Sequence, residues 1–310
     1  MLNDRITFGV QADVTSSATE WFDLARRVEA AGFDALYVAD HVGVTASPFA
    51  ALAAAAAVTT TLRLGTYVLN SGAYEPRALA SAAATLDRLS NGRTVLGIGA
   101  GHTPSEWTMS GRVYPSPAER VGRLAEMVEV VTALLEGEVV SHHGRYLDLN
   151  DAVVSAPRPV QERIPLLIGG NGRALLGLAG RKADIVGLTG SGRTLEDGHR
   201  HEVDWRAEAI DERVDIVRTA SSARTTGCIM DALVQYVEIT NRRDEAAARC
   251  ARVAGKATAA DVLAAPYVLV GTLDQLVAEI AEHHERWGIS SYVVRTDAID
   301  SVARIIQRLR

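Results

Sequence analysis

The sequence predicts a (β/α)₈ barrel (a TIM barrel) with inserted loops at its carboxyl-end mouth, and three observations support this α/β fold class. Short segments rich in Val, Ile and Leu alternate along the chain with longer segments of helical periodicity. Most of the short segments are apolar throughout, which is typical of parallel strands buried on both faces. Roughly eight such units follow one another, which favours a closed barrel over the alternative of an open, doubly wound sheet.

The first half of the chain marks its helices clearly. Ser17 and Glu20 match a capping box, in which the hydroxyl accepts from an amide three residues on, and Gly32 ends the helix that follows. Residues 117–135 carry apolar side chains at helical spacing, which predicts a long amphipathic helix. The other elements predicted in this half are strands at 6–12, 36–39, 62–69 and 94–98, and helices that begin at Pro48 and Pro76.

The second half continues the alternation but contains two interruptions. Residues from about 138 to 160 have few helix signals and suggest an inserted loop with a short hairpin. Residues 191–226 are polar, charged and poor in periodicity, and suggest an excursion over one mouth of the fold. We therefore expect a single domain over residues 1–310 with these two insertions. The elements predicted in this half are strands at 166–168, 185–188, 233–239 and 292–295, and helices at 173–181, 244–254, just before Pro266, 273–287 and 301–309.

The composition argues against several classes of function. The net charge of −6 is unusual for a nucleic-acid binder, which would present a basic face. Cys228 and Cys250 are far apart with no second pair, so neither a disulfide framework nor a cysteine-ligated zinc site is expected. The apolar run 49–58 is too short to span a bilayer, and the polar start 1–8 lacks a signal-peptide core. We expect a cytoplasmic protein with no membrane or nucleic-acid partner and no metal.

Polar and glycine residues gather where the predicted strands end. In a parallel barrel the active site lies at the carboxyl ends of the strands, so this clustering predicts an enzyme. The residues concerned are Gln11 and Asp13, Asp40 and His41, Asn70 and Ser71, then Gly99, Gly101, His102 and Glu106, and finally Gly169, Gly170 and Asn171.

Two of these groups allow a functional and a structural interpretation. His41 at a strand end can exchange a proton near neutral pH, or it can simply be satisfied by a backbone carbonyl at a helix start. The glycines from Gly97 to Gly101 let a cofactor ring or phosphate approach the backbone, or they form a tight turn leaving the strand. They do not match a dinucleotide-binding fingerprint, because no helix begins directly after Gly101.

A third group, from Gly169 to Arg173, lies between a predicted strand and a predicted helix. Its amides would line a helix amino terminus, where a phosphate group is attracted, and Arg173 would add charge. The alternative is a flexible turn between strand and helix. We favour phosphate, because the loop positions before Arg173 lack large side chains.

The order and spacing of these motifs resemble the luciferase-like monooxygenase superfamily, specifically its F420-dependent branch. The likeness runs over nearly the whole chain. It is carried by Gly32-Phe33-Asp34, Ala39-Asp40-His41, Leu64-Gly65-Thr66-Tyr67-Val68, Asp87 to Arg93, Gly97-Ile98-Gly99-Ala100-Gly101 with Glu106, Pro165 to Gly170, Ala179-Gly180-Arg181, Ala183-Asp184 and Val270-Gly271-Thr272.

The resemblance implies a deazaflavin ring at the carboxyl-end mouth, backed by a non-prolyl cis peptide that would here join Tyr67 and Val68. It implies a proton-transferring role for His41 near the reacting ring, and phosphate contacts from Gly169 and Gly170. Together with the strand-end residues, it leads us to assign cofactor contacts and catalysis. The cofactor contacts are Asp40, Tyr67, Val68, Asn70, Gly99, Gly101, Gly169, Gly170 and Asn171, and the catalytic residues are His41, His102 and Glu106.

The expected function is that of an F420-dependent oxidoreductase that moves hydride between deazaflavin and a small organic substrate. The alternatives are a flavin mononucleotide (FMN) monooxygenase of the same superfamily and a barrel that binds cofactor without turnover. Family members that oxidise glucose 6-phosphate carry Glu in place of His102 and Trp in place of Val44, which argues against that substrate. Because relatives are often dimers, we also expect a homodimer.

Overall fold

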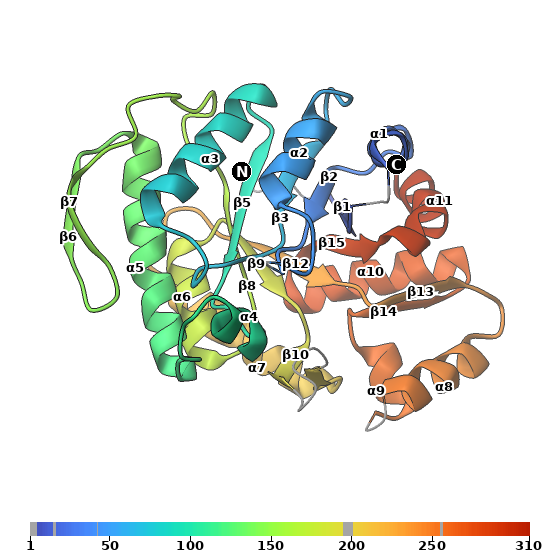
Figure 1. Ribbon diagram of the computed structural model, residues 1–310. Coiled ribbons are helices and arrows are strands. Elements are labelled where there is room, and N and C mark those ends of the chain that lie inside the picture. The colour runs from blue at the N-terminus through green and yellow to red at the C-terminus, as the bar shows by residue number, and fades with distance from the viewer. Residues whose placement is uncertain (1–4, 15–16, 42, 195–200, 255–256) are drawn as a thin grey trace. The chain divides into compact units, whose positions relative to one another are not determined.

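The computed structural model describes residues 5–14, 17–41, 43–194, 201–254 and 257–310 (Figure 1). The fold is the predicted (β/α)₈ barrel. The chain divides into two compact units, which we call the central unit and the terminal unit. Among the described residues, each unit contributes four parallel strands of the barrel. The central unit comprises Asp13–Arg26 and Leu36–Gly169, and the terminal unit comprises Met1–Ala12, Arg27–Ala35 and Gly170–Arg310.

The strands of the central unit end at the residues that the sequence marks as functional. Its strands are β2 (Ala35–Val38), β3 (Arg63–Thr66), β4 (Leu69–Asn70), β5 (Thr94–Gly99) and β8 (Leu166–Gly169). Both β3 and β4 pair with β5 in parallel, Leu64 beside Thr94 and Leu69 beside Ile98. They are therefore two parts of the single strand predicted at 62–69, interrupted at residues 67 and 68.

Helices of the central unit begin largely where the sequence places prolines, since proline fits the first turn of a helix. They are α2 (Pro48–Ala56), α3 (Pro76–Leu89), α4 (Pro104–Met109) and α5 (Pro117–Glu136). The helix α1 (Ala18–Ala30) has residues in both units, and its Ser17 hydroxyl accepts from the Glu20 amide as predicted. The antiparallel hairpin of β6 (Val140–His143) and β7 (Asp148–Ala152) confirms the hairpin expected near 138–160, and Figure 1 shows it beside α5.

The motif from Asp87 to Arg93 is structural. The carboxylate of Asp87 is fully buried and accepts from the amides of Val160 and Gln161. The guanidinium of Arg93 donates five hydrogen bonds, which reach the end of α2, the loop after it and the turn after α3. These two side chains join segments that are distant in sequence, so the motif stabilises the frame on which the site is built.

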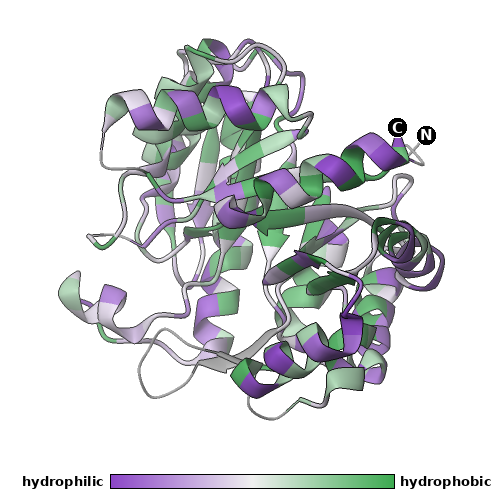
Figure 2. Ribbon diagram, turned by 90° about the vertical axis from the view of Figure 1, so that its right-hand side faces the viewer, coloured by the Kyte–Doolittle hydropathy of each residue, from purple (hydrophilic) through white to green (hydrophobic). Residues whose placement is uncertain are grey.

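The terminal unit holds the other four barrel strands, in the order β1 (Thr7–Ala12), β15 (Ile289–Arg295), β12 (Ile229–Leu233) and β9 (Ile185–Leu188). All three pairings between them are parallel. Its helices are α6 (Arg173–Lys182), α7 (Ala207–Ser221), α8 (Arg243–Ala254), α9 (Ala259–Ala264), α10 (Leu273–Trp287), the 3₁₀ turn η1 (Thr296–Ala298) and α11 (Ile299–Leu309). Figure 2 shows α11 with a hydrophobic and a hydrophilic side, and its buried residues are Ile299, Val302, Ile305 and Ile306.

The structure corrects two predictions in this unit. The strand predicted at 233–239 is wrong: the barrel strand is β12, and residues 236–239 form β13 (Tyr236–Ile239), which pairs in parallel with β14 (Val268–Gly271). Segment 191–226 is also not simply an excursion, because it contains α7. The buried side of α7 includes Ile210, Val214 and Val217, and the many charged residues around them made this helical pattern hard to recognise in the sequence.

The rest of segment 191–226 is only partly described. It contains an antiparallel pair, β10 (Ser191–Thr194) with β11 (His201–Val203). Residues 195–200 of the predicted insertion lie outside the described residues. A single domain with insertions at 138–160 and 191–226 therefore stays a prediction, with α7 removed from the second insertion.

Candidate functional site

The carboxyl ends of β2, β4 and β5 bring three of the predicted site residues into direct contact, all within the central unit. His41 follows β2, Asn70 ends β4, and Glu106 lies on the short helix α4 after β5. The Nδ1 atom of His41 lies 2.7 Å from Oε1 of Glu106. The side-chain amide of Asn70 donates to Oε2 of the same carboxylate over 2.9 Å. Parallel strands end at one edge of a sheet, which is why residues so distant in sequence meet here.

The electrostatics of the pair favour charge on both partners. Burial opposes ionisation of Glu106, but hydrogen bonds from His41 and Asn70 outweigh burial and bring its pKa below the ordinary value of a glutamate. The hydrogen bond to Glu106 raises the pKa of His41, against the opposing effect of burial. Because an ionised carboxylate can only accept, Nδ1 of His41 carries a proton. Its Nε2 is the ring nitrogen that does not contact Glu106.

The carboxyl of Asp40 does not form a dyad with His41. Its hydrogen bonds are with the backbone amide of Asn70, at 3.4 Å, and with the side chain of Tyr74. Burial raises the pKa of Asp40, and these two hydrogen bonds offset only part of the rise. The two carboxyls of the site therefore differ: Glu106 ionises more readily than an ordinary glutamate, and Asp40 ionises less readily than an ordinary aspartate.

His102 stands beside His41 rather than in the buried network. The two imidazole rings meet edge to face, with centroids 5.9 Å apart and an interplanar angle of 88°. The side chain of His41 is 35% exposed and His102 is exposed, whereas the side chain of Glu106 is only 4% exposed. The site thus has an ionised carboxylate at its base and two imidazoles at its accessible surface.

The backbone around this network has the features that the sequence led us to expect. The peptide bond between Tyr67 and Val68 is cis, as predicted. Gly99 leaves room for the side chain of Val68, since a Cβ on Gly99 would lie 2.6 Å from it. Gly101 has a φ of 75°, in the region that favours glycine, and a Cβ there would overlap the carboxamide of Asn70.

The predicted phosphate loop is divided between the two units. Gly169 ends β8 in the central unit, and its carbonyl oxygen would lie 3.7 Å from a Cβ on Gly99. Gly170 and Asn171 belong to the terminal unit, where Gly170 has a φ of 148° and its amide donates to the carbonyl of Gly187. The helix α6 begins at Arg173, as predicted. Phosphate binding by this loop stays a prediction.

Besides the two imidazoles, one buried hydroxyl in the central unit is consistent with binding of a flat, polar ring. Ser71, directly after Asn70, is fully buried, and its hydroxyl has no hydrogen-bond partner among the described groups. Its backbone amide donates to the carbonyl of Gly99, which places the backbone of Ser71 beside the end of β5. A buried hydroxyl without a partner is costly, and a carbonyl or N–H on the edge of a ring would satisfy it.

Other histidines lie outside this network. In the hairpin, His142 contacts Glu126 and His143 contacts Asp148. His283, in the last part of α10, is buried, and burial lowers its pKa to about 4. Among the described residues, no group of three or more His, Cys, Asp or Glu side chains could hold a metal ion.

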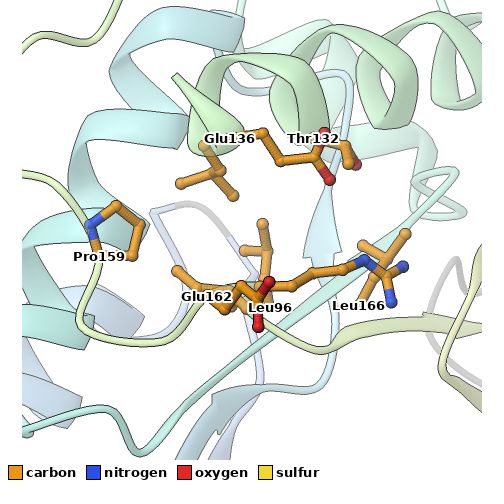
Figure 3. A pocket seen from close by; sticks show the side chains of 9 residues that line it. Leu96, Thr132, Glu136, Pro159, Glu162 and Leu166 are labelled. Carbon is orange, nitrogen blue, oxygen red and sulfur yellow. The ribbon is translucent and has the colours of Figure 1, made fainter. Parts of the chain in front are cut away.

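A small pocket occurs in the central unit away from the strand ends (Figure 3). Its walls come from the second half of α5, the loop before β8 and the strands β5 and β8. Leu96 and Leu166 pair with each other in the sheet, three residues before the ends of their strands, so the pocket is not part of the histidine network. The lining residues are Leu96, Thr132, Leu135, Glu136, Pro159, Glu162, Arg163, Ile164 and Leu166.

Sequence reasoning missed two contributions to the site. Asn70 was assigned to the cofactor, yet its carboxamide holds Glu106. Tyr74, which hydrogen bonds with Asp40, was not singled out at all. The only signal for Tyr74 was its position shortly after a strand end, and nothing in the sequence pointed to Asp40 as its partner.

Comparison with known proteins identifies the family. The profile of the luciferase-like monooxygenase family matches residues 5–291. The chain belongs to this family. Two curated relatives of this luciferase-like protein are F420-dependent glucose-6-phosphate dehydrogenases. The one from Amycolatopsis mediterranei is 34% identical over 208 residues, covering 64% of this chain and 62% of the relative. The one from Nakamurella multipartita is 36% identical over 223 residues, covering 67% and 65%. The chain thus spans less than two thirds of the length of either relative.

Solved structures of similar fold cover almost the whole luciferase-like chain. The coenzyme F420-dependent tetrahydromethanopterin reductase from Methanopyrus kandleri matches with a TM-score of 0.78 and 21% identity, covering 99% of this chain and all of that one. An F420-dependent secondary alcohol dehydrogenase in complex with an F420-acetone adduct has a TM-score of 0.76 and 19% identity, covering 99% of both chains. At these identities the likeness shows the fold alone.

No helix among the described residues is long and apolar enough to cross a membrane.

Proposed function

We propose that this protein is an F420-dependent oxidoreductase that transfers hydride between deazaflavin and a small organic substrate. The observation that carries the proposal is the pair of His41 and Glu106 at the carboxyl-end rim, where a partly exposed imidazole is backed by a buried carboxylate. Support also comes from the two curated relatives and the two structural neighbours described above, all of which are named for F420.

The residues present define how the cofactor would be held. The ring would contact the backbone of Gly99 and Gly101, the cis peptide between Tyr67 and Val68, and the hydroxyl of Ser71. Asp40, Gly169, Gly170 and Asn171 are the further cofactor contacts in this proposal. When bound, the deazaflavin supplies a ring carbon that accepts or donates hydride, and the protein supplies binding and orientation.

The protein's own part in the reaction is proton transfer and orientation. Nε2 of His41 gives or takes a proton on the substrate as hydride moves, while Nδ1 stays hydrogen bonded to Glu106. Glu106 acts through His41, because its carboxylate is buried and both of its oxygens are engaged. His102, exposed beside His41, would orient or polarise the substrate.

The substrate of this proposal is a small organic molecule other than glucose 6-phosphate. The family resemblance implies that members which oxidise this sugar carry Glu and Trp at the positions of His102 and Val44. Here His102 is exposed beside His41, and Val44, whose amide donates to the carbonyl of His41, is 63% exposed. An apolar and an imidazole side chain thus flank the proton-transferring group.

A cofactor titration tests the proposal. Purified protein is titrated separately with F420 and with FMN while cofactor and protein fluorescence are followed, and the preferred cofactor is then used to screen alcohols, carbonyl compounds and enones. We expect saturable binding of F420 and cofactor turnover with at least one substrate class. Binding of FMN alone, with oxygen-dependent oxidation of substrate, would instead establish the monooxygenase alternative. F420 binding without turnover on the full panel would support the non-catalytic barrel.

We also propose a cytoplasmic homodimer. The helix α2 has no charged residue, and its Phe49 and Ala50 are at least partly accessible to solvent. A helix face without charges is favoured in contacts between subunits over contact with water. Light scattering of the purified protein should give about twice the mass of the 33.1 kDa chain, and a monomeric mass at micromolar concentration would rule this out.

A further inference from the structure

We propose that Asn70 is a positioning residue that fixes the tautomer of His41 by holding Glu106. The inference concerns the proton that His41 presents, and its functional meaning rests on the proposed function. It replaces the expectation that Asn70 serves the cofactor. The contacts made by the side chain of Asn70, a residue that is only 4% exposed, support this assignment.

The carboxamide of Asn70 is held in one orientation. Its nitrogen donates to Oε2 of Glu106 over 2.9 Å, and its oxygen accepts from the backbone amide of Gly72 over 2.9 Å. Flipping the carboxamide would place an NH₂ against the Gly72 amide and an oxygen against a carboxylate, so both hydrogen bonds would be lost. Asn70 therefore always faces Glu106 with its NH₂ group and never with its oxygen.

This donor decides how Glu106 meets His41. With Oε2 engaged by Asn70, Oε1 faces Nδ1 of His41 at 2.7 Å. The two hydrogen bonds stabilise the carboxylate anion, which requires a proton on Nδ1 and leaves Nε2 as the nitrogen that accepts or donates. Without Asn70, Glu106 would lose one of its two nearest donors and keep only His41 and the side chain of Thr103, and its carboxyl group could rotate or take up a proton more readily.

The backbone is built around this side chain. A Cβ on Gly101 would overlap the Asn70 carboxamide, and a Cβ on Gly72 would overlap the ring of Trp107. Trp107 directly follows Glu106 on α4, so the second contact helps to place the helix that carries the carboxylate. The sequence assigns Gly101 to the cofactor. The structure gives a separate explanation for a glycine at this position, which is that a side chain here would overlap Asn70.

The tautomer can be measured without cofactor or substrate. Full-length protein labelled with ¹⁵N at histidine is studied by two-bond ¹⁵N–¹H correlation NMR, and His41→Asn identifies the His41 signals. We expect wild-type His41 to be the Nδ1-protonated tautomer when neutral. In Asn70→Leu, which is similar in size but cannot donate, and in Asn70→Ser, we expect a substantial Nε2-protonated population. We also expect the pKa of His41 to fall toward the free imidazole value of about 6.5.

Asn150→Ala, in the exposed part of the hairpin, is the matched control and should leave both readouts unchanged. If Asn70→Leu fails to fold, Asn70→Ser decides the question. Unchanged His41 tautomer and pKa in either folded Asn70 variant would overturn the proposal. Because the NMR measurement needs no turnover, this outcome is separate from the cofactor titration, which can fail while Asn70 still fixes His41.

Discussion

His41 and Glu106 are joined by a 2.7 Å hydrogen bond although 65 residues separate them in the sequence. The side chain of His41 is 35% exposed and that of Glu106 is 4% exposed, so the imidazole is accessible while the carboxylate that holds it stays buried. The buried anion raises the pKa of the imidazole, which is the arrangement expected of a group that transfers protons near neutral pH.

Replacing His41 with Asn should lower turnover strongly while leaving cofactor affinity nearly unchanged. Proton transfer by a positioned side chain contributes about 10² to 10⁴-fold in rate, so we expect a loss of that order in kcat. The measurement is steady-state kinetics with F420, together with fluorescence titration of the cofactor. His143→Asn, in the exposed hairpin, is the control. Turnover at the wild-type rate would remove His41 from the catalytic role.

Replacing Glu106 with Gln should shift the pH dependence of the reaction to lower pH. The hydrogen bond to the carboxylate raises the pKa of His41, so its loss should lower that pKa toward the value of free imidazole. The limb of the kcat/KM profile that reports His41 should move in this direction whether His41 acts as acid or as base. A profile with the same midpoints as wild type would show that Glu106 does not control His41.

Glu279 should make the protein less stable as pH rises. Burial raises the pKa of Glu279 to about 7, even though Oε2 lies 2.8 Å from the guanidinium of Arg243. In the unfolded chain the pKa of a glutamate is about 4.3, so the folded state binds more protons between these values and loses stability as pH rises through this window. The loss is at most about 4 kcal/mol, since one pKa unit corresponds to about 1.4 kcal/mol.

Urea unfolding between pH 4 and pH 8 measures this slope. Glu279→Gln, which keeps a polar group facing Arg243 but cannot ionise, should flatten it. Glu285→Gln, at an exposed position of the same helix, is the control. An unchanged slope in Glu279→Gln would mean that Glu279 ionises at its ordinary pKa in the folded protein.

Arg93→Lys should destabilise the fold without a direct effect on the chemistry. The guanidinium donates to three backbone carbonyls near the end of α2, to the hydroxyl of Thr59 and to the carbonyl of Ser90, a set that a single ammonium cannot match. We expect a loss of about 2–4 kcal/mol in the free energy of unfolding. Arg88→Lys, exposed at the end of α3, should change it by less than about 0.5 kcal/mol. A similar effect for both would contradict this role for Arg93.

Much of the site was visible in the sequence because barrel topology is regular. The carboxyl ends of parallel strands meet at one mouth, so His41, Asn70, His102 and Glu106 could be grouped from their positions after strands. What the grouping could not give was the partner of each side chain. Asn70 and Tyr74 are polar residues near a strand end, and only the fold decides that one holds Glu106 and the other hydrogen bonds with Asp40.

The failures in the fold have a physical cause as well. The apolar residues of α7 are few and lie among many charged ones, so the local composition resembled that of a loop. Only the packing of these residues inside the terminal unit identifies the segment as a helix. Likewise, β12 and β13 lie three residues apart, and sequence alone merged part of one with the other.

The sequence by itself determined the barrel, the family and the strand ends that carry the chemistry, because periodicity, glycines and prolines act locally. The tertiary structure decided which carboxyl ionises more readily and which nitrogen of His41 contacts Glu106. Those properties depend on burial and on hydrogen bonds between segments that are distant in sequence, and no local pattern records them.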